Sequence, residues 1–330
     1  MLTNRLLLLT TACALPLATV ACGGSDDGDT ITPEGTHHGY VVSKATAVPA
    51  LGHMPIELGI DVGSKTGATL DGKPENQLGE ALQFLKSINM GLNIQTSLDG
   101  AIAQGTILLL LDFQSKDFVN SNAGLGVKFG ATPMPPACSG QADTVCGNHL
   151  KGGASFTVAA SSPHDALLGG KLANGAFNGG PGELSLEIAF GSTEPILLPL
   201  HHARAKVTSV SATALSGFIG GVMTVGELHD TVGAGIQKSV TGFLADGCTE
   251  LTKPPGCGCS GLAMQVMMLI DGQTAADPIP DCKLSIDELV NNPVISDYLK
   301  PDACSMDTCS APDALSVGIQ IDAVAATFPM

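Results

Sequence analysis

The chain has 330 residues, with 15 Lys and Arg against 31 Asp and Glu, which gives a net charge of −16. Such an acidic composition argues against a basic groove for phosphates, so nucleic acid is not an expected partner. Aromatic residues make up 4% of the chain, with two Tyr and no Trp. This scarcity argues against stacking platforms for carbohydrates and against an outer-membrane barrel with aromatic girdles.

Residues 1–21 have the layout of a secretory signal peptide. One positive charge, Arg5, precedes an apolar stretch that begins at Leu6 and is interrupted by Pro16. The stretch is shorter than the roughly 20 apolar residues that a membrane-spanning helix needs, and a polar run follows it at residues 23–27. We therefore expect residues 1–21 to be removed on export.

The end of this stretch, Leu17-Ala18-Thr19-Val20-Ala21-Cys22, resembles the lipobox of bacterial lipoproteins. The resemblance implies cleavage before Cys22, lipidation of that cysteine with palmitate-type chains, and attachment to a membrane through two or three of them. Thr19 stands where the family usually has Leu, which leaves ordinary signal-peptide cleavage as an alternative. Gly23 instead of Asp after the cysteine implies the outer membrane, on its periplasmic side or at the cell surface. Residues 22–36 are expected to form a flexible tether.

The cysteine count agrees with export and lipidation. Of ten cysteines, Cys13 leaves with the signal peptide and Cys22 carries lipid, and the even set that remains suits paired thiols in an oxidising compartment. These eight candidates for disulfides are Cys138, Cys146, Cys248, Cys257, Cys259, Cys282, Cys304 and Cys309.

Short loops favour two local disulfides, Cys138 with Cys146 and Cys304 with Cys309. For the other four, we expect Cys248 to pair with Cys257 or Cys259, and Cys282 to take the one that remains. The alternative is a metal site at Cys257-Gly258-Cys259, which is disfavoured because thiols in an oxidising compartment pair before they hold zinc.

Residues 37–330 are expected to form one β-rich domain. Residues 40–48, rich in Val and Thr, predict a first strand. Leu78, Leu82 and Leu85 recur at the spacing of one helix face, and a second helix is predicted near residues 94–102, ended by Gly105. Residues 106–113 have the apolar composition of a buried strand.

Short strand-like runs separated by turn residues dominate the next hundred residues. They lie at residues 155–159, 183–190, 196–200, 205–210 and 217–223. This rhythm predicts a mainly β (α+β) fold, an antiparallel β-sandwich or jelly-roll-like body, with a helical pair near the N-terminus and short helices near the C-terminus. Thr224 is a predicted helix cap before a helix marked by Ile236, Val240 and Leu244. Residues 315–321 alternate as a terminal strand.

Residues 277–289 resemble an EF-hand calcium loop followed by a short helix, within a C-terminal segment of residues 271–330. Asp277, Asp281 and Glu288 match its first, fifth and twelfth positions. Ile279 and Cys282 replace an oxygen ligand and the turn glycine, which favours a metal-free loop whose turn is held by a disulfide through Cys282. Calcium on the three carboxylates is the alternative, and no other cofactor is predicted.

Two further polar segments are interpreted as structural. An acidic loop at residues 61–76 reads as a turn and a helix start, because acidic residues suit the positive end of a helix dipole. His201 and His202 are adjacent near a predicted strand, where their rings would point to opposite faces and could not chelate one ion. The chain has no G-x-S-x-G and no H-E-x-x-H motif.

The general arrangement resembles the uncharacterised, disulfide-containing lipoproteins of bacterial cell envelopes, a resemblance that implies no particular activity. We expect a lipid-anchored envelope protein that is not an enzyme and has a binding or structural role. The alternatives are a carrier of an apolar ligand, suggested by the aliphatic content, a calcium-binding envelope protein, and a secreted hydrolase that would use His164, His201 or His229.

Overall fold

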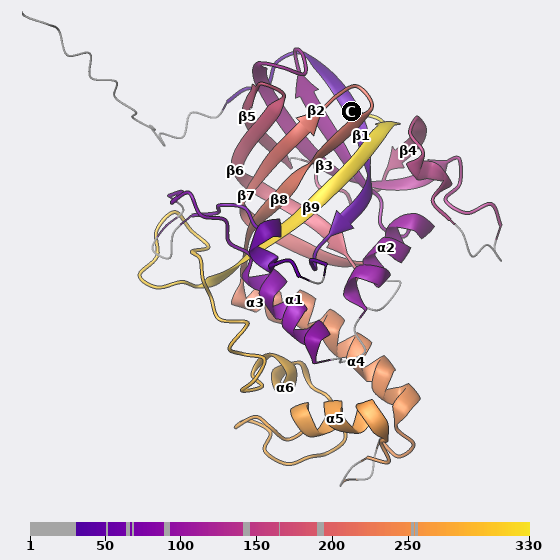
Figure 1. Cartoon of the computed structure of the whole chain (residues 1–330), viewed down its shortest axis with the longest axis vertical. Coiled ribbons are helices and arrows are strands. Elements are labelled where there is room, and N and C mark those ends of the chain that lie inside the picture. Colours follow the sequence, from indigo (N-terminus) through magenta and orange to yellow (C-terminus); the bar gives the residue numbers. More distant parts are fainter. Residues whose placement is uncertain are drawn as a thin grey trace, which may run out of the picture.

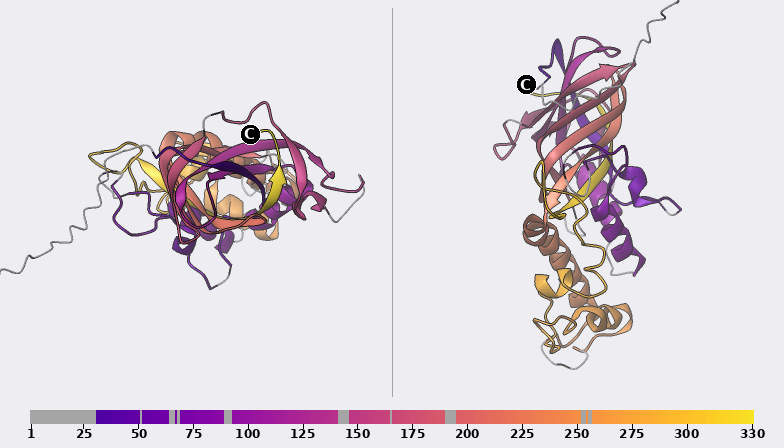
Figure 2. Two further views of the ribbon diagram at one scale, coloured as in Figure 1. Left: turned by 90° about the horizontal axis from the view of Figure 1, so that it is seen from above. Right: turned by 90° about the vertical axis from the view of Figure 1, so that its left-hand side faces the viewer.

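A computed structural model describes residues 31–50, 52–63, 67, 69–88, 93–140, 146–164, 166–189, 195–251, 254 and 257–330. It shows a β-barrel with a helical region at one end (Figure 1). Eight antiparallel strands close the barrel in the order β1, β2, β3, β5, β6, β7, β8, β9, with β9 paired to β1. The ring is visible from above in Figure 2. Their bounds are β1 Thr36–Thr46, β2 Leu109–Ser115, β3 Ser121–Met134, β5 Leu167–Ala173, β6 Ala176–Ile188, β7 Ile196–Val210, β8 Ala214–Thr224 and β9 Ala314–Thr327.

One short strand, β4 (Ala154–Val158), lies outside this ring. It pairs antiparallel with the end of β3 and parallel with the end of β9. Its Phe156 joins Val41, Leu110 and Phe328 in a small apolar cluster that is separate from the main core. β4 and the adjoining 3₁₀ turn η2 (Asn148–Leu150) therefore cover part of the outer barrel wall.

Side chains pack the inside of the barrel. Tyr40, Phe113 and Phe177 are fully buried in the main core, and the rings of Phe113 and Phe177 meet edge to face at 5.4 Å. The Tyr40 hydroxyl donates to the Ser211 carbonyl at 2.6 Å, and burial raises the pKa of Tyr40 to about 12. An eight-stranded barrel is just wide enough for side chains to fill it, so this interior is a core and does not favour the apolar-carrier alternative.

Both predicted N-terminal helices are confirmed. A 3₁₀ turn, η1 (Pro55–Leu58), precedes α1 (Gln77–Ser87), which packs on β9, and α2 (Ile94–Gln104) packs on β1. Leu82 is fully buried, as its place on the apolar face of α1 requires. α2 ends at Gly105, whose φ of 73° is the left-handed conformation that glycine adopts most easily after a helix.

The helical region follows β8 and contains α3 (Val225–Glu227), a π-helical turn η3 (Leu228–Gly233), α4 (Ala234–Gly247), α5 (Gly261–Ile270) and α6 (Ile286–Val290). Figures 1 and 2 show it beyond one end of the barrel. Thr224 is the helix cap, as predicted, and it forms a reciprocal capping box with Glu227. Leu228, Val232 and Ile236 join the barrel core, so one apolar core runs through both parts. Among the described residues no helix is both long and apolar enough to cross a bilayer.

The predicted sandwich or jelly roll is wrong, because the sheet closes on itself. Two strands that the sequence did not reveal, β3 and β5, complete the ring. Both are rich in glycine, and glycine is unfavourable in strands unless another backbone comes close. Here it does, since a Cβ at Gly170 would lie 2.1 Å from the Asn178 carbonyl oxygen of β6. β7 is also one strand and not two, with its pairing to β8 shifted between His201 and Arg204.

Candidate functional site

Four disulfides brace the chain: Cys138–Cys146, Cys248–Cys259, Cys257–Cys282 and Cys304–Cys309. The two predicted local disulfides are confirmed. Of the two pairings left open for the other four cysteines, the structure has Cys248 bonded to Cys259 and Cys282 bonded to Cys257. Multiple disulfides of this kind indicate an extracytoplasmic protein. Cys22 lies outside the described residues, so its lipidation stays a prediction.

The turn of the EF-hand-like segment is held by a disulfide and by backbone hydrogen bonds. Cys282 has a φ of 67°, at the position where the family has glycine, and it is bonded to Cys257. Glu288 is buried. Its carboxylate accepts hydrogen bonds from the Gly272 amide and, in the capping box of α6, from the amide and hydroxyl of Ser285.

Other carboxylates in this segment also bond to the backbone. Asp281 accepts from the Lys283 amide, and the buried Asp271 accepts from the amides of Asp281 and Cys282. Asp271 lies within 4.8 Å of the sulfurs of Cys257 and Cys282, but both sulfurs are in a disulfide and are not thiolate ligands. Asp277, Asp281 and Glu288 do not form such a group among the described residues, and calcium there stays a prediction.

A segment made of residues 55–63, 67 and 69–76, here called the strap, crosses the outer faces of β8 and β9. Two glycines let it touch the sheet. A Cβ at Gly220 of β8 would lie 2.2 Å from Cγ2 of Ile60, and one at Gly318 of β9 would lie 2.5 Å from the Leu58 carbonyl oxygen. Ile60 also packs with Val62 and Val222 in an apolar cluster of its own. The strap is therefore seated on the barrel wall.

Asn76 fastens the strap and starts α1 at the same time. Its Oδ1 accepts from the amides of Gly79 and Gly318, both at 3.0 Å. Its Nδ2 donates to the carbonyls of Pro55 at 3.0 Å and Gly318 at 3.2 Å. The side chain is only 4% exposed, so each of these bonds is made in a desolvated setting, where an unmade bond is expensive.

Between the strap and the barrel lies a cleft of about 480 Å³. The strap supplies one wall, which includes Ile56, Ile60 and Leu70, and the floor is formed by outward residues of β6, β7 and β8. The floor carries Arg204 and Lys206. β6 and β7 have irregular registers beside it, at residues 179–184 and 201–204, and such bulges are common next to functional sites because they re-aim side chains.

Three carboxylates of the strap, Asp61, Asp71 and Glu75, have oxygens within 4.8 Å of one another. Burial raises the pKa of Glu75 to about 7, helped by the charges of the other two and of Asp302 and opposed by a hydrogen bond from the Val62 amide. A carboxyl with a raised pKa in the folded state favours folding at acidic pH, so this contribution fades as pH rises towards 7. Five of the six carboxylate oxygens of this cluster already accept hydrogen bonds from the chain, whereas calcium takes six to eight oxygen ligands.

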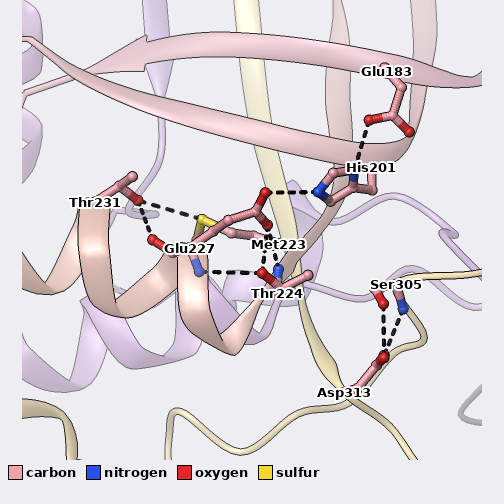
Figure 3. Close-up of polar contacts among 8 residues, drawn as sticks. All are labelled: Glu183, His201, Met223, Thr224, Glu227, Thr231, Ser305 and Asp313. Atoms are coloured by element: carbon pink, nitrogen blue, oxygen red, sulfur yellow. Dashed lines mark hydrogen bonds and ion pairs between the residues drawn. The ribbon is translucent and has the colours of Figure 1, made fainter.

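A histidine held between two carboxylates joins the barrel to the helical region (Figure 3). His201 of β7 places Nδ1 2.7 Å from Oε2 of Glu183 in β6 and Nε2 2.9 Å from Oε1 of Glu227 in α3. Oε2 of Glu227 in turn accepts from the amide and hydroxyl of Thr224. Thr231 in η3 donates to the Glu227 carbonyl at 2.6 Å. The arrangement ties β6, β7 and β8 to α3 and η3 at the barrel rim.

The charge of His201 follows from this geometry. Burial lowers its pKa, but hydrogen bonds and attraction from Glu227 and Glu183 outweigh it and raise the pKa of His201 above its ordinary value. The pKa of Glu227 is lowered: burial would raise it, but the hydrogen bonds from Thr224 and His201 prevail. A neutral imidazole has one N–H and could donate to only one carboxylate. The bridge is thus complete only when His201 is protonated.

We expect this bridge to weaken at alkaline pH. Its stabilisation is fully present below the unfolded-state pKa of His, about 6.5, and is lost as pH rises through the higher folded-state pKa. The free energy of unfolding of the wild-type protein should therefore fall between about pH 6 and 9. In His201→Gln this fall should be smaller by ~1 kcal/mol, a modest value because the pair is partly exposed to solvent. Urea unfolding across this range measures it, with His164→Gln as the control, since His164 has no ion pair among the described residues. Equal slopes for both variants would contradict the assignment.

Of the other two histidines of the hydrolase alternative, His164 has no ion pair within the described residues, whereas His229 has two. His229 in η3 lies 2.9 Å from Asp230 and 3.5 Å from Asp287. The hydrogen bond to Asp230, opposed by burial and supported by Asp287, raises the pKa of His229. The bonding partners found for His201 and His229 in the described part of the chain are carboxylates, and none is a Ser or Cys nucleophile. His202 turns elsewhere, 3.9 Å from Asp307.

The sequence did not predict the cleft, because the residues that line it are far apart in the chain. Arg204 and Lys206 occupy outward positions of β7, but without the neighbouring strands nothing marks them as a floor. The glycines Gly220 and Gly318 were a usable signal, since glycine inside a strand often marks the close approach of another backbone.

Comparison with protein families, with curated proteins and with solved structures finds no match to this chain.

Proposed function

We propose that the chain is a lipid-anchored protein of the cell envelope that binds a ligand or partner through the cleft between the strap and the barrel, without catalysis. The observation that carries the binding role is the cleft itself. Its volume of about 480 Å³ falls within the range of small-molecule sites, and its lining combines apolar side chains with a few charged ones, as such sites do. The walls are fixed by Asn76 and by the close seating of Ile60 on Gly220.

The anchor is supported by the lipobox-like sequence and by the disulfides. Attachment would be through acyl chains on Cys22 to the outer membrane, on either side of it. The exported location agrees with the four disulfides. Hydrolysis by His201 or His229 is disfavoured because both engage carboxylates through both ring nitrogens, which leaves neither ring nitrogen positioned to act as a general base.

The anchor predicts a specific response to loss of one thiol. Cys22→Ser should move the protein from the membrane fraction to the soluble fraction, and the mature wild-type protein should weigh more than its polypeptide from residue 22 by the mass of its acyl chains. Fractionation and intact mass spectrometry measure this. Cys13→Ser, which changes a residue of the removed peptide, is the matched control and should change neither result. A wild-type mass equal to the bare polypeptide would refute the anchor.

The cleft can be tested without knowledge of the ligand. A library of small amphipathic fragments, added to isotope-labelled protein, should shift the amide signals of the lining glycines Gly59, Gly179 and Gly180. Leu70→Gln, inside the cleft, should abolish these shifts, whereas Leu197→Gln, similarly exposed but on β7 outside it, should not. Fragments that gather elsewhere, for example in the groove of about 540 Å³ beside Phe84 and Tyr298, would contradict the proposed site.

A further inference from the structure

The cleft floor belongs to a basic strip on the barrel wall. Lys171 of β5 is opposite Asn178 of β6, Asn178 is opposite Lys206 of β7, and Lys206 is opposite Phe218 of β8. Side chains directly opposite on neighbouring strands share a face, so the two lysines flank Asn178 on the outer wall. Arg204, two residues from Lys206 on the same strand, shares this face. We name Lys171, Arg204 and Lys206 the basic strip.

This concentration of positive charge stands out against the rest of the chain, which has 15 basic and 31 acidic residues. The sequences of β5, β7 and β8 contain no Asp or Glu, and the two Glu of β6 lie in its second half, at residues 183 and 187, away from Asn178. Lys206 is exposed and forms no ion pair within the described residues. The strip therefore gathers positive charge on one wall of the cleft in a negative protein.

The carboxylates on the opposite wall are already engaged by the strap. Glu57 bonds to His53 at 2.7 Å and to the Met54 amide. The two oxygens of Asp61 accept from the amides of Gly63 at 3.2 Å and Gly72 at 2.7 Å. Their charges are thus partly satisfied within the strap. On the floor, the Arg204 guanidinium carries five N–H donors and the Lys206 ammonium carries three.

Apolar groups complete the cleft. Ile60 and Leu70 on the strap and Phe218 on the floor all line it. Phe218 lies opposite Lys206 in the strand register, so a charged group and an aromatic ring are neighbours on the floor. A molecule that fills the space would place an apolar part against these three residues and a charged group beside Lys206 and Arg204.

We propose that the cleft binds an amphipathic anion, a single apolar tail with a carboxylate or phosphate head, whose head lies against Lys206 and Arg204. This inference rests on the proposed function, which makes the cleft the binding site. It adds the sign of the ligand charge and the residues that recognise it. Charge-assisted hydrogen bonds to the head would supply specificity, and burial of the tail would supply most of the affinity.

The test uses the full chain carrying Cys22→Ser and four probes with the same tail: octanoate, octyl phosphate, octanol and octylammonium. Binding is followed by the amide shifts of Gly179 and Gly180. At least one anion should bind about tenfold more tightly than octanol, octylammonium should bind most weakly, and added salt should reduce only the affinity for anions. The two anions distinguish a carboxylate ligand from a phosphate ligand.

Substitutions then assign the head group. Lys206→Gln should reduce the affinity for the better anion by about fivefold to tenfold and leave octanol binding unchanged. Lys86→Gln removes the same charge from a residue that lines the groove beside Phe84 and should have no effect. Octanol or octylammonium binding in the cleft as tightly as both anions, or an unchanged affinity in Lys206→Gln, would overturn the inference and leave the binding site standing. Shifts confined to other surfaces would overturn both.

Discussion

Asn76→Ala should lower the free energy of unfolding by about 3 kcal/mol. The change removes the cap of α1, which is typically worth ~1 kcal/mol. It also leaves the amide and carbonyl of Gly318 and the carbonyl of Pro55 without their partner in a buried setting, where each unsatisfied group is destabilising by roughly 1–3 kcal/mol unless water reaches it. Urea unfolding measures the loss.

Two further variants show which of these bonds matter. Asn76→Asp keeps the acceptor for the Gly79 amide but loses both donated bonds, so a loss close to that of Asn76→Ala would locate the effect in the attachment of the strap. Asn93→Ala is the matched control, because Asn93 occupies the same position before α2 but is exposed and makes no capping hydrogen bond. It should change the free energy by less than about 0.5 kcal/mol. A comparable loss in Asn93→Ala would contradict the special role of Asn76.

Removal of the Cys257–Cys282 disulfide should be the most destabilising change in the helical region. The paired substitution Cys257→Ala with Cys282→Ala opens a loop of 25 residues, for which chain entropy predicts a loss of roughly 3.5 kcal/mol. Both cysteines are buried in the main core, at 1% and 4% exposure. We expect lower stability in urea and new proteolytic cleavage between α4 and α6.

The matched control is the paired substitution of Cys304 and Cys309 by Ala. This disulfide closes a separation of only 5 residues, so the same entropy relation predicts a smaller loss, roughly 2 kcal/mol. Cleavage between α4 and α6 should not increase, because the loop lies outside that region. If the two double variants lost equal stability and showed the same cleavage, loop length and core burial would not explain the effect.

The sequence predicted those features that depend on neighbouring residues. The leucines of α1, Gly105 after α2 and Thr224 before α3 all produced the local structure expected from them. The disulfides could be predicted because cysteines joined by short loops pair easily, and few possible partners then remained for the other cysteines. Cys282, in the place of a turn glycine, has the left-handed conformation which that place requires.

Closure of the barrel depends on pairings that no local pattern reveals. β3 and β5 carry glycines where strands usually carry β-branched residues. Their role is apparent only from what lies against them, the side chain of Pro33 at Gly124 and the backbone of Asn178 at Gly170. The cleft has the same origin. Arg204, Lys206 and Ile60 come together only through the register of β7 and the seating of the strap, so sequence alone could place each residue on an element but could not bring them together.

The position of β9 between β1 and β8 has a consequence for how the protein matures. Ser43 in β1 bonds to Asp322 in β9, 279 residues further along the chain, so the first strand acquires its second neighbour only when the last strand arrives. Contacts so distant in sequence slow folding. A chain that is still emerging from the export machinery would expose two unsatisfied strand edges, on which other chains could assemble. Chaperones in the compartment that receives the chain would then be needed during that interval, and not once the ring has formed.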